Sequence, residues 1–103
     1  MKQNKKRYIY FRLHQDGPTV TDRQLGNAIW KSMLSLFGEI TVADARFFLN
    51  DFNEADGTGY LQCNAALTHQ LIISAVLIDS IEKTKVSFEP KKTSGTIKSL
   101  LKS

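Results

Sequence analysis

The chain has 103 residues, of which 42% are hydrophobic and 23% are charged, and its formal net charge is +4 at pH 7. This length suits a single domain, residues 1–103, with one small core, and the composition excludes disordered and fibrous proteins. The one cysteine excludes an internal disulfide and a cysteine-rich zinc site. No apolar run approaches the roughly 18 residues of a membrane helix, and the N-terminus lacks the apolar region of a signal peptide. We therefore expect a cytoplasmic protein without a membrane partner.

Positive charge is concentrated at the two ends of the chain. A basic N-terminal arm, residues 1–7, carries four positive charges, and a basic C-terminal segment, residues 91–103, carries four more. The residues between them have a net charge of −4. This asymmetry favours a polyanionic partner, and the alternative is that both ends are solvated tails that keep the protein soluble.

Residues 7–14 predict a half-buried strand, because apolar side chains alternate with polar and aromatic ones. The inward face would carry Ile9, Phe11 and Leu13, and the outward face Tyr8, Tyr10 and Arg12. A turn at residues 15–18 ends this strand.

A helix is expected after the turn. Thr21 and Gln24 form the pattern of a capping box at its start, and Gly38 is placed to end it. Its apolar residues recur at helical spacing: Leu25, Ala28, Ile29, Met33, Leu36 and Phe37. Residues 39–45 then form a short connection with partial helical character.

Residues 46–64 give the clearest β-hairpin signal, two apolar runs joined by a polar turn that contains Asp56 and Gly57. We take residues 54–57 as the loop. The resulting register pairs Asn53 with Thr58, Phe52 with Gly59, Asn50 with Leu61, and Phe48 with Cys63. We expect the face that carries Leu61 and Cys63 to lie in the core, together with Phe48 and Phe52, because a one-residue slip would exchange the two faces. The Phe52 ring would then cover the strand glycine.

Residues 66–82 predict a second helix, with an inward stripe of Leu67, Leu71, Ala75, Ile78 and Ile81. Four further residues widen the apolar arc beyond the needs of a one-sided surface helix: Ile72, Ile73, Val76 and Leu77. This surplus indicates a second contact surface, which we assign to a partner protein. A short strand at residues 85–89, ended by Pro90, and a last helix at residues 96–102 complete the chain.

The order of these elements predicts an α+β fold of the ferredoxin-like type, β-α-β-β-α-β, with a C-terminal helix added. In this fold two helices cover one face of a four-stranded antiparallel sheet whose first and third strands are central. The outward tyrosines of the first strand would then lie beside Tyr60 and Gln62 on the open face. RNA-recognition modules carry base-stacking aromatic residues at this place. The alternative is that these tyrosines pack against a protein or against the terminal helix.

No catalytic or metal-binding constellation is expected. His14 and His69 have no cysteine or histidine at metal-ligand spacing. The acidic residues of the hairpin tip depart from a calcium loop, because Gln62 stands where the closing glutamate would be. The sequence contains neither a phosphate-binding glycine motif nor a nucleophile with a recognisable base.

Residues 91–98 are the second candidate for a binding site. A Ser-Gly-Thr sequence at a helix start leaves backbone N–H groups free to bind an anion, and the neighbouring lysines add charge. The bland alternative is an ordinary helix cap. The candidates for phosphate contact in this segment are Lys91, Lys92, Ser94, Gly95, Thr96 and Lys98.

Four segments together resemble a known family: residues 5–9, 28–39, 58–63 and, most distinctively, the Ser-Gly-Thr-Ile-Lys of residues 94–98. On these motifs the sequence resembles the ribonuclease P protein component 2 family, the small archaeal subunit that is shared with eukaryotic ribonuclease P and ribonuclease MRP. Asn50 departs from the family, which usually has an apolar residue there.

The resemblance implies a ribonucleoprotein enzyme that removes the 5′ leader of precursor tRNA, in which the RNA and its bound magnesium perform the hydrolysis. The chain itself would then be a subunit without catalytic residues and without a cofactor of its own. Its implied partners are the ribonuclease P RNA, protein component 3, other ribonuclease P proteins, precursor tRNA and a second copy of itself within a heterotetramer.

Residues and resemblance together give two sets of candidate site residues. The RNA-binding set is Lys5, Lys6, Arg7, Tyr8, Tyr10, Arg12, Lys91, Lys92, Ser94, Gly95, Thr96 and Lys98. The partner-binding set is Ile72, Ile73, Val76 and Leu77. Two other functions stay open: a generic module for single-stranded RNA, and a ferredoxin-like assembly or regulatory domain without an RNA role.

Overall fold

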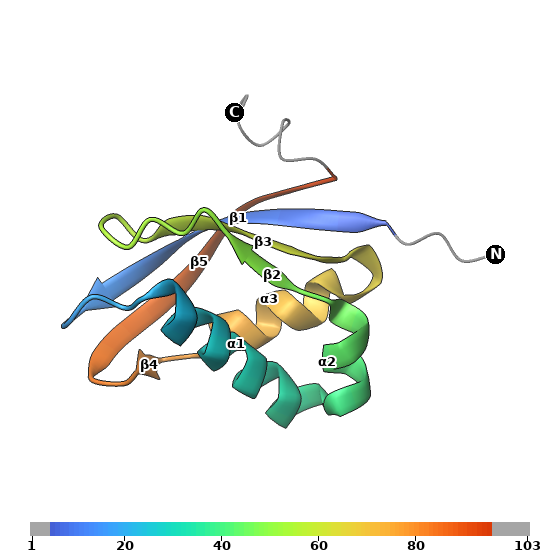
Figure 1. Cartoon of the computed structure of the whole chain (residues 1–103), viewed down its shortest axis with the longest axis horizontal. Helices are drawn as coiled ribbons and strands as arrows, with labels where there is room; N and C mark the ends of the chain where they lie inside the picture. The colour runs from blue at the N-terminus through green and yellow to red at the C-terminus, as the bar shows by residue number, and fades with distance from the viewer. Residues whose placement is uncertain (1–4, 96–103) are drawn as a thin grey trace.

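The computed structural model describes residues 5–95, which form one antiparallel sheet with helices on one of its faces (Figure 1). The elements in chain order are β1 (Lys6–Asp16), α1 (Asp22–Phe37), α2 (Glu39–Ala45), β2 (Phe48–Asn50), β3 (Thr58–Asn64), the 3-10 turn η1 (Ala65–Leu67), α3 (Thr68–Val76), β4 (Ser80–Ile81) and β5 (Thr84–Ser94).

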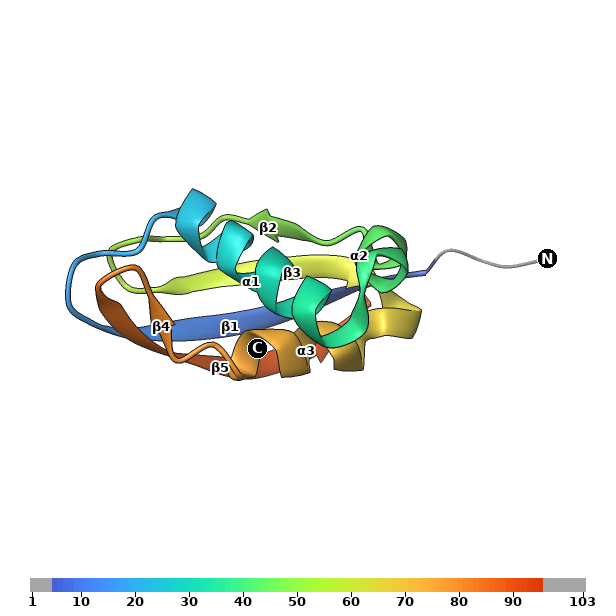
Figure 2. The same ribbon diagram turned by 90° about the horizontal axis from the view of Figure 1, so that it is seen from below.

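The sheet has the strand order β2-β3-β1-β5-β4, so the expected ferredoxin-like arrangement is confirmed, with β1 and β3 inside the sheet. The short edge strand β4 is an addition to the four strands that the sequence predicts. Figure 2 shows α1 and α3 side by side across one face, which leaves the other face of the sheet without a helix in residues 5–95.

The core lies between the sheet and the helices, and β1 supplies its centre. Ile9, Phe11 and Leu13 are buried, as their alternation predicts. The Phe11 ring stacks between two others, with centroids 4.6 Å from Phe88 and 6.0 Å from Phe52. A row of stacked rings therefore ties β1 to both neighbouring parts of the sheet.

Helix α1 begins with the predicted capping box. Thr21 Oγ1 accepts from Gln24 N at 3.2 Å, and Gln24 Oε1 accepts from Thr21 N at 3.0 Å. Gly38 ends the helix with a φ of 89°, where its N–H donates to the Leu34 carbonyl. Leu36 and Phe37 share the helical spacing of the buried residues but are 46% and 37% exposed, because the end of α1 runs away from the sheet before α2 leads the chain back to β2 (Figure 1).

The hairpin has the predicted turn but a different strand register. Asn53 N donates to the Thr58 carbonyl at 2.7 Å, as expected, yet β2 and β3 pair Phe48 with Gln62, Leu49 with Leu61 and Asn50 with Tyr60. The shift of one residue occurs between Asn50 and Asn53, where Asp51 has a φ of 52° and a bulge sets one extra residue against β3.

This bulge exchanges the faces of β2. Leu49 packs against the core, whereas Phe48 is 62% exposed, which corrects the core position predicted for Phe48. Asn50 turns to the open face, where its Nδ2 donates to Gln62 Oε1 at 3.4 Å. Phe52 lies beyond the bulge and covers Gly59 as predicted, so that a Cβ built on Gly59 would lie 3.1 Å from Phe52 Cα.

The second long helix is shorter than predicted. Helix α3 ends at Val76, and residues 80–81 form β4 instead of continuing the helix. Ile81 still reaches the core, but from a strand, since Glu82, with a φ of 54°, turns the chain back toward β5. The apolar period alone does not distinguish these two ways of burying Ile81.

Strand β5 is longer than predicted and does not stop at Pro90. Pro90 pairs with Phe11, and the register shifts between this pair and the next, Tyr10 with Lys92. Proline has no N–H to give to the ladder, so within a sheet it is tolerated at a bulge, where the regular hydrogen bonding is already interrupted. Consequently Lys91, Lys92 and Ser94 belong to a strand, although the sequence predicts that the strand ends before them. Thr96, Lys98 and the helix expected at residues 96–102 lie outside the described residues.

Candidate nucleic-acid interface

The open face of the sheet carries a pair of tyrosines at its centre. Tyr10 of β1 lies directly opposite Tyr60 of β3, with ring centroids 5.3 Å apart and planes tilted by 41°. Tyr8 pairs with Gln62 in the same register, and Arg12 is exposed two residues further along β1. The structure therefore places Tyr8, Tyr10 and Arg12 on the face that the sequence predicts for them. The three tyrosines are half-buried, and aromatic residues beside polar groups on an open sheet face form the stacking platform of RNA-binding modules.

Strand β5 brings the C-terminal basic segment to this platform. Lys92 pairs with Tyr10, and Ser94 pairs with Tyr8. A Cβ built on Gly95 would lie 3.9 Å from Arg7 Nη1, so the guanidinium of the N-terminal arm lies beside the end of β5. Basic residues from both ends of the chain thus meet at this end of the sheet, a junction that the separate charge runs of the sequence do not reveal. Lys92 shares the face of the tyrosines, whereas Arg7 alternates with Tyr8 and leaves β1 on the opposite side.

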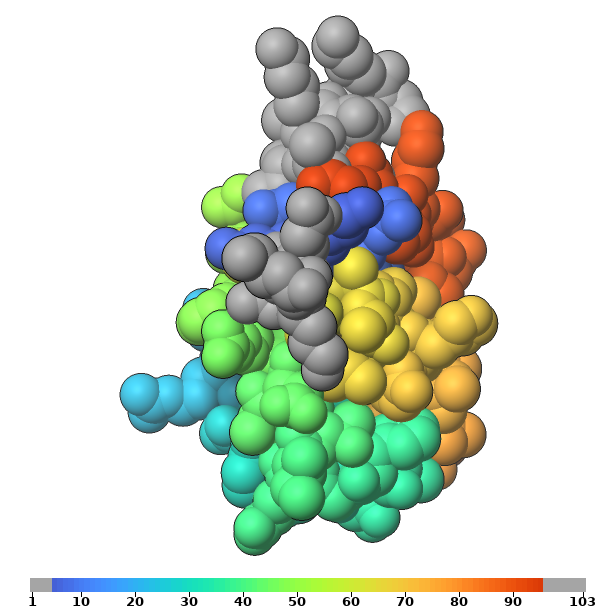
Figure 3. All heavy atoms as spheres, turned by 90° about the vertical axis from the view of Figure 1, so that its right-hand side faces the viewer, coloured from blue at the N-terminus to red at the C-terminus, as the bar shows by residue number. Residues whose placement is uncertain are grey.

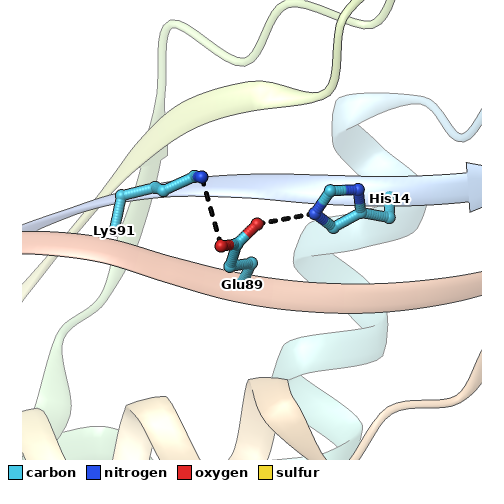
Figure 4. A network of polar contacts seen from close by, with 3 residues as sticks. All are labelled: His14, Glu89 and Lys91. Atoms are coloured by element: carbon cyan, nitrogen blue, oxygen red, sulfur yellow. Dashed lines mark hydrogen bonds and ion pairs between the residues drawn. The ribbon is translucent and has the colours of Figure 1, made fainter.

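A polar network borders the same face (Figure 4). Glu89 accepts from His14 Nε2 at 2.6 Å through Oε1, and its Oε2 lies 3.1 Å from Lys91 Nζ. The hydrogen bond from His14, and then that from Lys91, hold the pKa of Glu89 below its ordinary value. The carboxylate offsets much of the charge of Lys91. The sequence gives no sign of this network, because its members come from two strands that are far apart in the chain.

Lys5 and Lys6 lie at the start of β1, next to the end of β3. Lys6 pairs with Asn64, and the Lys5 carbonyl accepts from Ala65 N at 2.8 Å. Together with Arg46 and Phe48 they line a hollow of about 260 Å³ at the edge of the sheet. Sequence reasoning missed Arg46 and assigned Phe48 to the core. The signal that could have found them is Asp51, since aspartate is one of the few residues that readily adopt a positive φ and so permit the bulge.

Three of the four residues predicted to bind a partner form an exposed apolar stripe on α3. Ile73, Val76 and Leu77 are 44%, 47% and 60% exposed, whereas Ile72 packs partly against the core. Their spacing places the three on one side of the helix.

Within residues 5–95 no group of three or more histidine, cysteine, aspartate or glutamate side chains is arranged to hold a metal ion. No helix in this part of the chain is long and apolar enough to cross a membrane. Cys63 is buried, and burial raises the pKa of its thiol, so the side chain packs as a neutral group.

Comparisons with known proteins agree over nearly the whole chain. The sequence model of the Rpp14/Pop5 family matches residues 7–103. The chain is 33% identical over 98 residues to ribonuclease P protein component 2 of Pyrococcus furiosus, and the match covers 95% of this chain and 81% of the relative. The proteins of the same name from Pyrococcus horikoshii and Thermococcus kodakarensis are each 30% identical with the same coverage.

A solved structure has the same fold. A chain in the cryo-EM structure of yeast ribonuclease MRP superimposes with a TM-score of 0.73 over 94% of this chain and 79% of that chain. The two sequences are only 9% identical, so this likeness concerns the fold alone.

Proposed function

The chain belongs to the Rpp14/Pop5 family, and from this membership we propose that it is the non-catalytic protein subunit of an RNA-based ribonuclease P that removes the 5′ leader of precursor tRNA. In this proposal the chain binds the catalytic domain of the RNA in the cytoplasm, together with protein component 3. The RNA and its magnesium perform the hydrolysis, and the protein stabilises the folded RNA.

The observation that carries the proposal is the meeting of the two basic ends at one end of a sheet whose open face is aromatic. Lys92 lies opposite Tyr10 beside a surface on which bases can stack, and Arg7 lies next to Gly95 at the end of the same pair of strands. Phosphates crowd together in a compact RNA, and bound cationic side chains offset their repulsion. The subunit would therefore lower the magnesium concentration that the RNA needs, and its binding would weaken as salt rises.

The exposed stripe of Ile73, Val76 and Leu77 is the surface that we propose for another protein of the complex. Component 3 is the first candidate, and a second copy of this chain within a heterotetramer is another. Burial of these three side chains would remove apolar surface from water without displacing any residue of the sheet face.

The test is cleavage of precursor tRNA by the cognate RNA and component 3, with and without this chain, over a range of magnesium concentrations. We expect the chain to lower the magnesium requirement. The double substitution Arg7→Glu and Lys92→Glu should abolish this effect, whereas a substitution of another exposed cation, Lys31→Glu on α1, should not. A chain that has no effect on cleavage and does not bind component 3 would contradict the proposal.

A second function is favoured by the Tyr10–Tyr60 pair alone, namely general binding of single-stranded RNA by stacking. It predicts that Tyr10→Ala weakens binding to any single strand to the same degree as binding to the cognate RNA. A ferredoxin-like regulatory domain without RNA would instead tolerate both the charge reversal and the tyrosine substitution.

A further inference from the structure

The hollow at the edge of the sheet has the components of a site for one nucleotide. It is lined by Lys5, Lys6, Arg46, Phe48, Gln62, Cys63 and Asn64, three of which are cations and none of which is acidic. Figure 3 looks at this end of the molecule and shows the start of β1 in blue near the green end of α2 and the yellow segment that follows β3. The lining residues therefore come from three separate parts of the chain.

An exposed aromatic ring forms one wall of this hollow. Phe48 is 62% exposed, while its neighbour Leu49 supplies the packing that β2 gives to the core. The ring thus lies outside the core, with its surface available to a ligand. Any of the nucleobases can stack on an aromatic side chain, because every base has a π face.

The other walls are held in place by contacts within the fold. Asn64 Oδ1 accepts from Ala66 N at 3.1 Å, and its Nδ2 donates to the Asp44 carbonyl at 3.2 Å. Cys63 is almost wholly buried. Gln62 Oε1 accepts from Asn50, and no described residue accepts from the Gln62 NH₂ group, which leaves a donor for the edge of a base.

The backbone at Arg46 has a strained conformation where it places the cation at the rim. Arg46 joins α2 to β2 with a φ of 47° and a ψ of 50°, the left-handed conformation that residues other than glycine, asparagine, aspartate and histidine rarely adopt. Strain of this kind is often retained where a side chain must be presented to a ligand. With Lys5 and Lys6 at the start of β1, Arg46 completes a cluster of three cations that suits a phosphate.

We propose that this hollow, the Phe48 pocket, binds one unpaired nucleotide of RNA, whose base stacks on Phe48 and whose phosphate lies among Lys5, Lys6 and Arg46. The volume of about 260 Å³ is below the ~300–1,000 Å³ of pockets that enclose a drug-sized ligand, so the hollow would hold the base and leave the sugar and phosphate at its rim. The base must be unpaired, because bases within an RNA helix are stacked and cannot enter. Since Gln62 lies opposite Tyr8, an RNA strand that leaves the pocket continues onto the tyrosine platform.

This inference rests on the proposed RNA-binding function and is tested apart from it, on the full chain alone. The probes are single-stranded RNA pentamers of one base each and an abasic ribose-phosphate pentamer of equal charge, and binding is measured by NMR titration of the backbone amides. We expect the pentamers with bases to bind at least about fivefold more tightly than the abasic one, the lower end of what stacking one base contributes. The amides of residues 46–48 and 62–64 should shift.

Three variants decide whether Phe48 provides the stacking surface. Phe48→Ala should reduce the preference for pentamers with bases by at least about fivefold, leaving only what the tyrosine platform contributes, and Phe48→Tyr should keep the full preference. Trp30→Ala, which removes an exposed aromatic residue on α1, should also keep it. Equal affinity for the abasic pentamer, or a preference that Phe48→Ala leaves undiminished, would overturn the pocket. If pentamer binding contradicts the pocket while the chain still lowers the magnesium requirement of cleavage, only this inference is lost. If pentamer binding supports the pocket but the chain does not lower the magnesium requirement, the proposed function is lost and the pocket stands.

Discussion

Two adjacent lysines of β5 should contribute very differently to RNA binding. Lys91 Nζ lies 3.1 Å from a Glu89 oxygen, whereas no described carboxylate lies within ion-pair distance of Lys92, which is opposite Tyr10. A cation that contacts a phosphate releases counterions, and each such contact contributes about 0.9 to the slope of log affinity against log salt on a duplex and about 0.7 on a single strand. Loss of the Lys92 contact should therefore reduce this slope by about 0.7–0.9.

The matched change at Lys91 removes a neutral pair. The double substitution Lys91→Ala and Glu89→Ala leaves the net charge unchanged, and we expect the slope to stay within experimental error of the wild type. When salt rises from about 50 to 200 mM, the affinity of the Lys92→Ala variant should fall by a factor about threefold smaller than that of the parent chain.

The assay is fluorescence anisotropy of the cognate RNA at several salt concentrations, with circular dichroism to confirm that each variant is folded. If the double variant loses as much slope as Lys92→Ala, Lys91 leaves Glu89 to contact a phosphate in the complex, and the reasoning from the ion pair is refuted.

Two further predictions concern stability. The pKa of Glu89 is lowered in the folded chain, so its contribution to stability is present above the ordinary glutamate pKa of about 4.3 and is lost as pH falls through the lower folded value. Glu89→Gln should therefore flatten the acidic part of a plot of urea unfolding midpoint against pH. An unchanged plot would contradict the network. Gly59→Ala should cost about 1–3 kcal/mol in urea unfolding, because its Cβ would press on the Phe52 backbone. Gly26→Ala in α1 has open space and should instead stabilise by about 0.4–1 kcal/mol, so equal effects at the two glycines would refute the packing argument.

The parts of the fold that follow from local pattern could be predicted from the sequence. Alternation in β1 correctly gave the buried face, and the Thr21 capping box and Gly38 correctly gave the limits of α1. The order of strands and helices was enough for the sheet topology, because few arrangements satisfy the rules for connecting them.

The errors arose where a neighbouring strand decides the outcome. The bulge at Asp51 moves β2 by one residue and so carries Phe48 from the predicted core to the open edge. In the sequence Pro90 indicates the end of a strand, but β5 continues past it and pairs with β1 on both sides of a bulge. Ile81 fits a helical period and a strand equally well, and the turn at Glu82 favours the strand. None of these choices is encoded in the spacing of apolar residues alone.

The same reasoning explains why the candidate interface could be predicted only in fragments. Tyr8, Tyr10 and Arg12 share a face by alternation, which is a local property. The meeting of Arg7 with Gly95 depends instead on the antiparallel pairing of the first strand with the last, which brings residues almost ninety positions apart to the same end of the sheet. Once that pairing is given, the two basic runs are no longer independent tails. Under the proposed function their cations act on the same RNA segment. Substitutions at Arg7 and Lys92 should therefore show coupled effects on binding, whereas each should add independently to a change at Lys31 on α1.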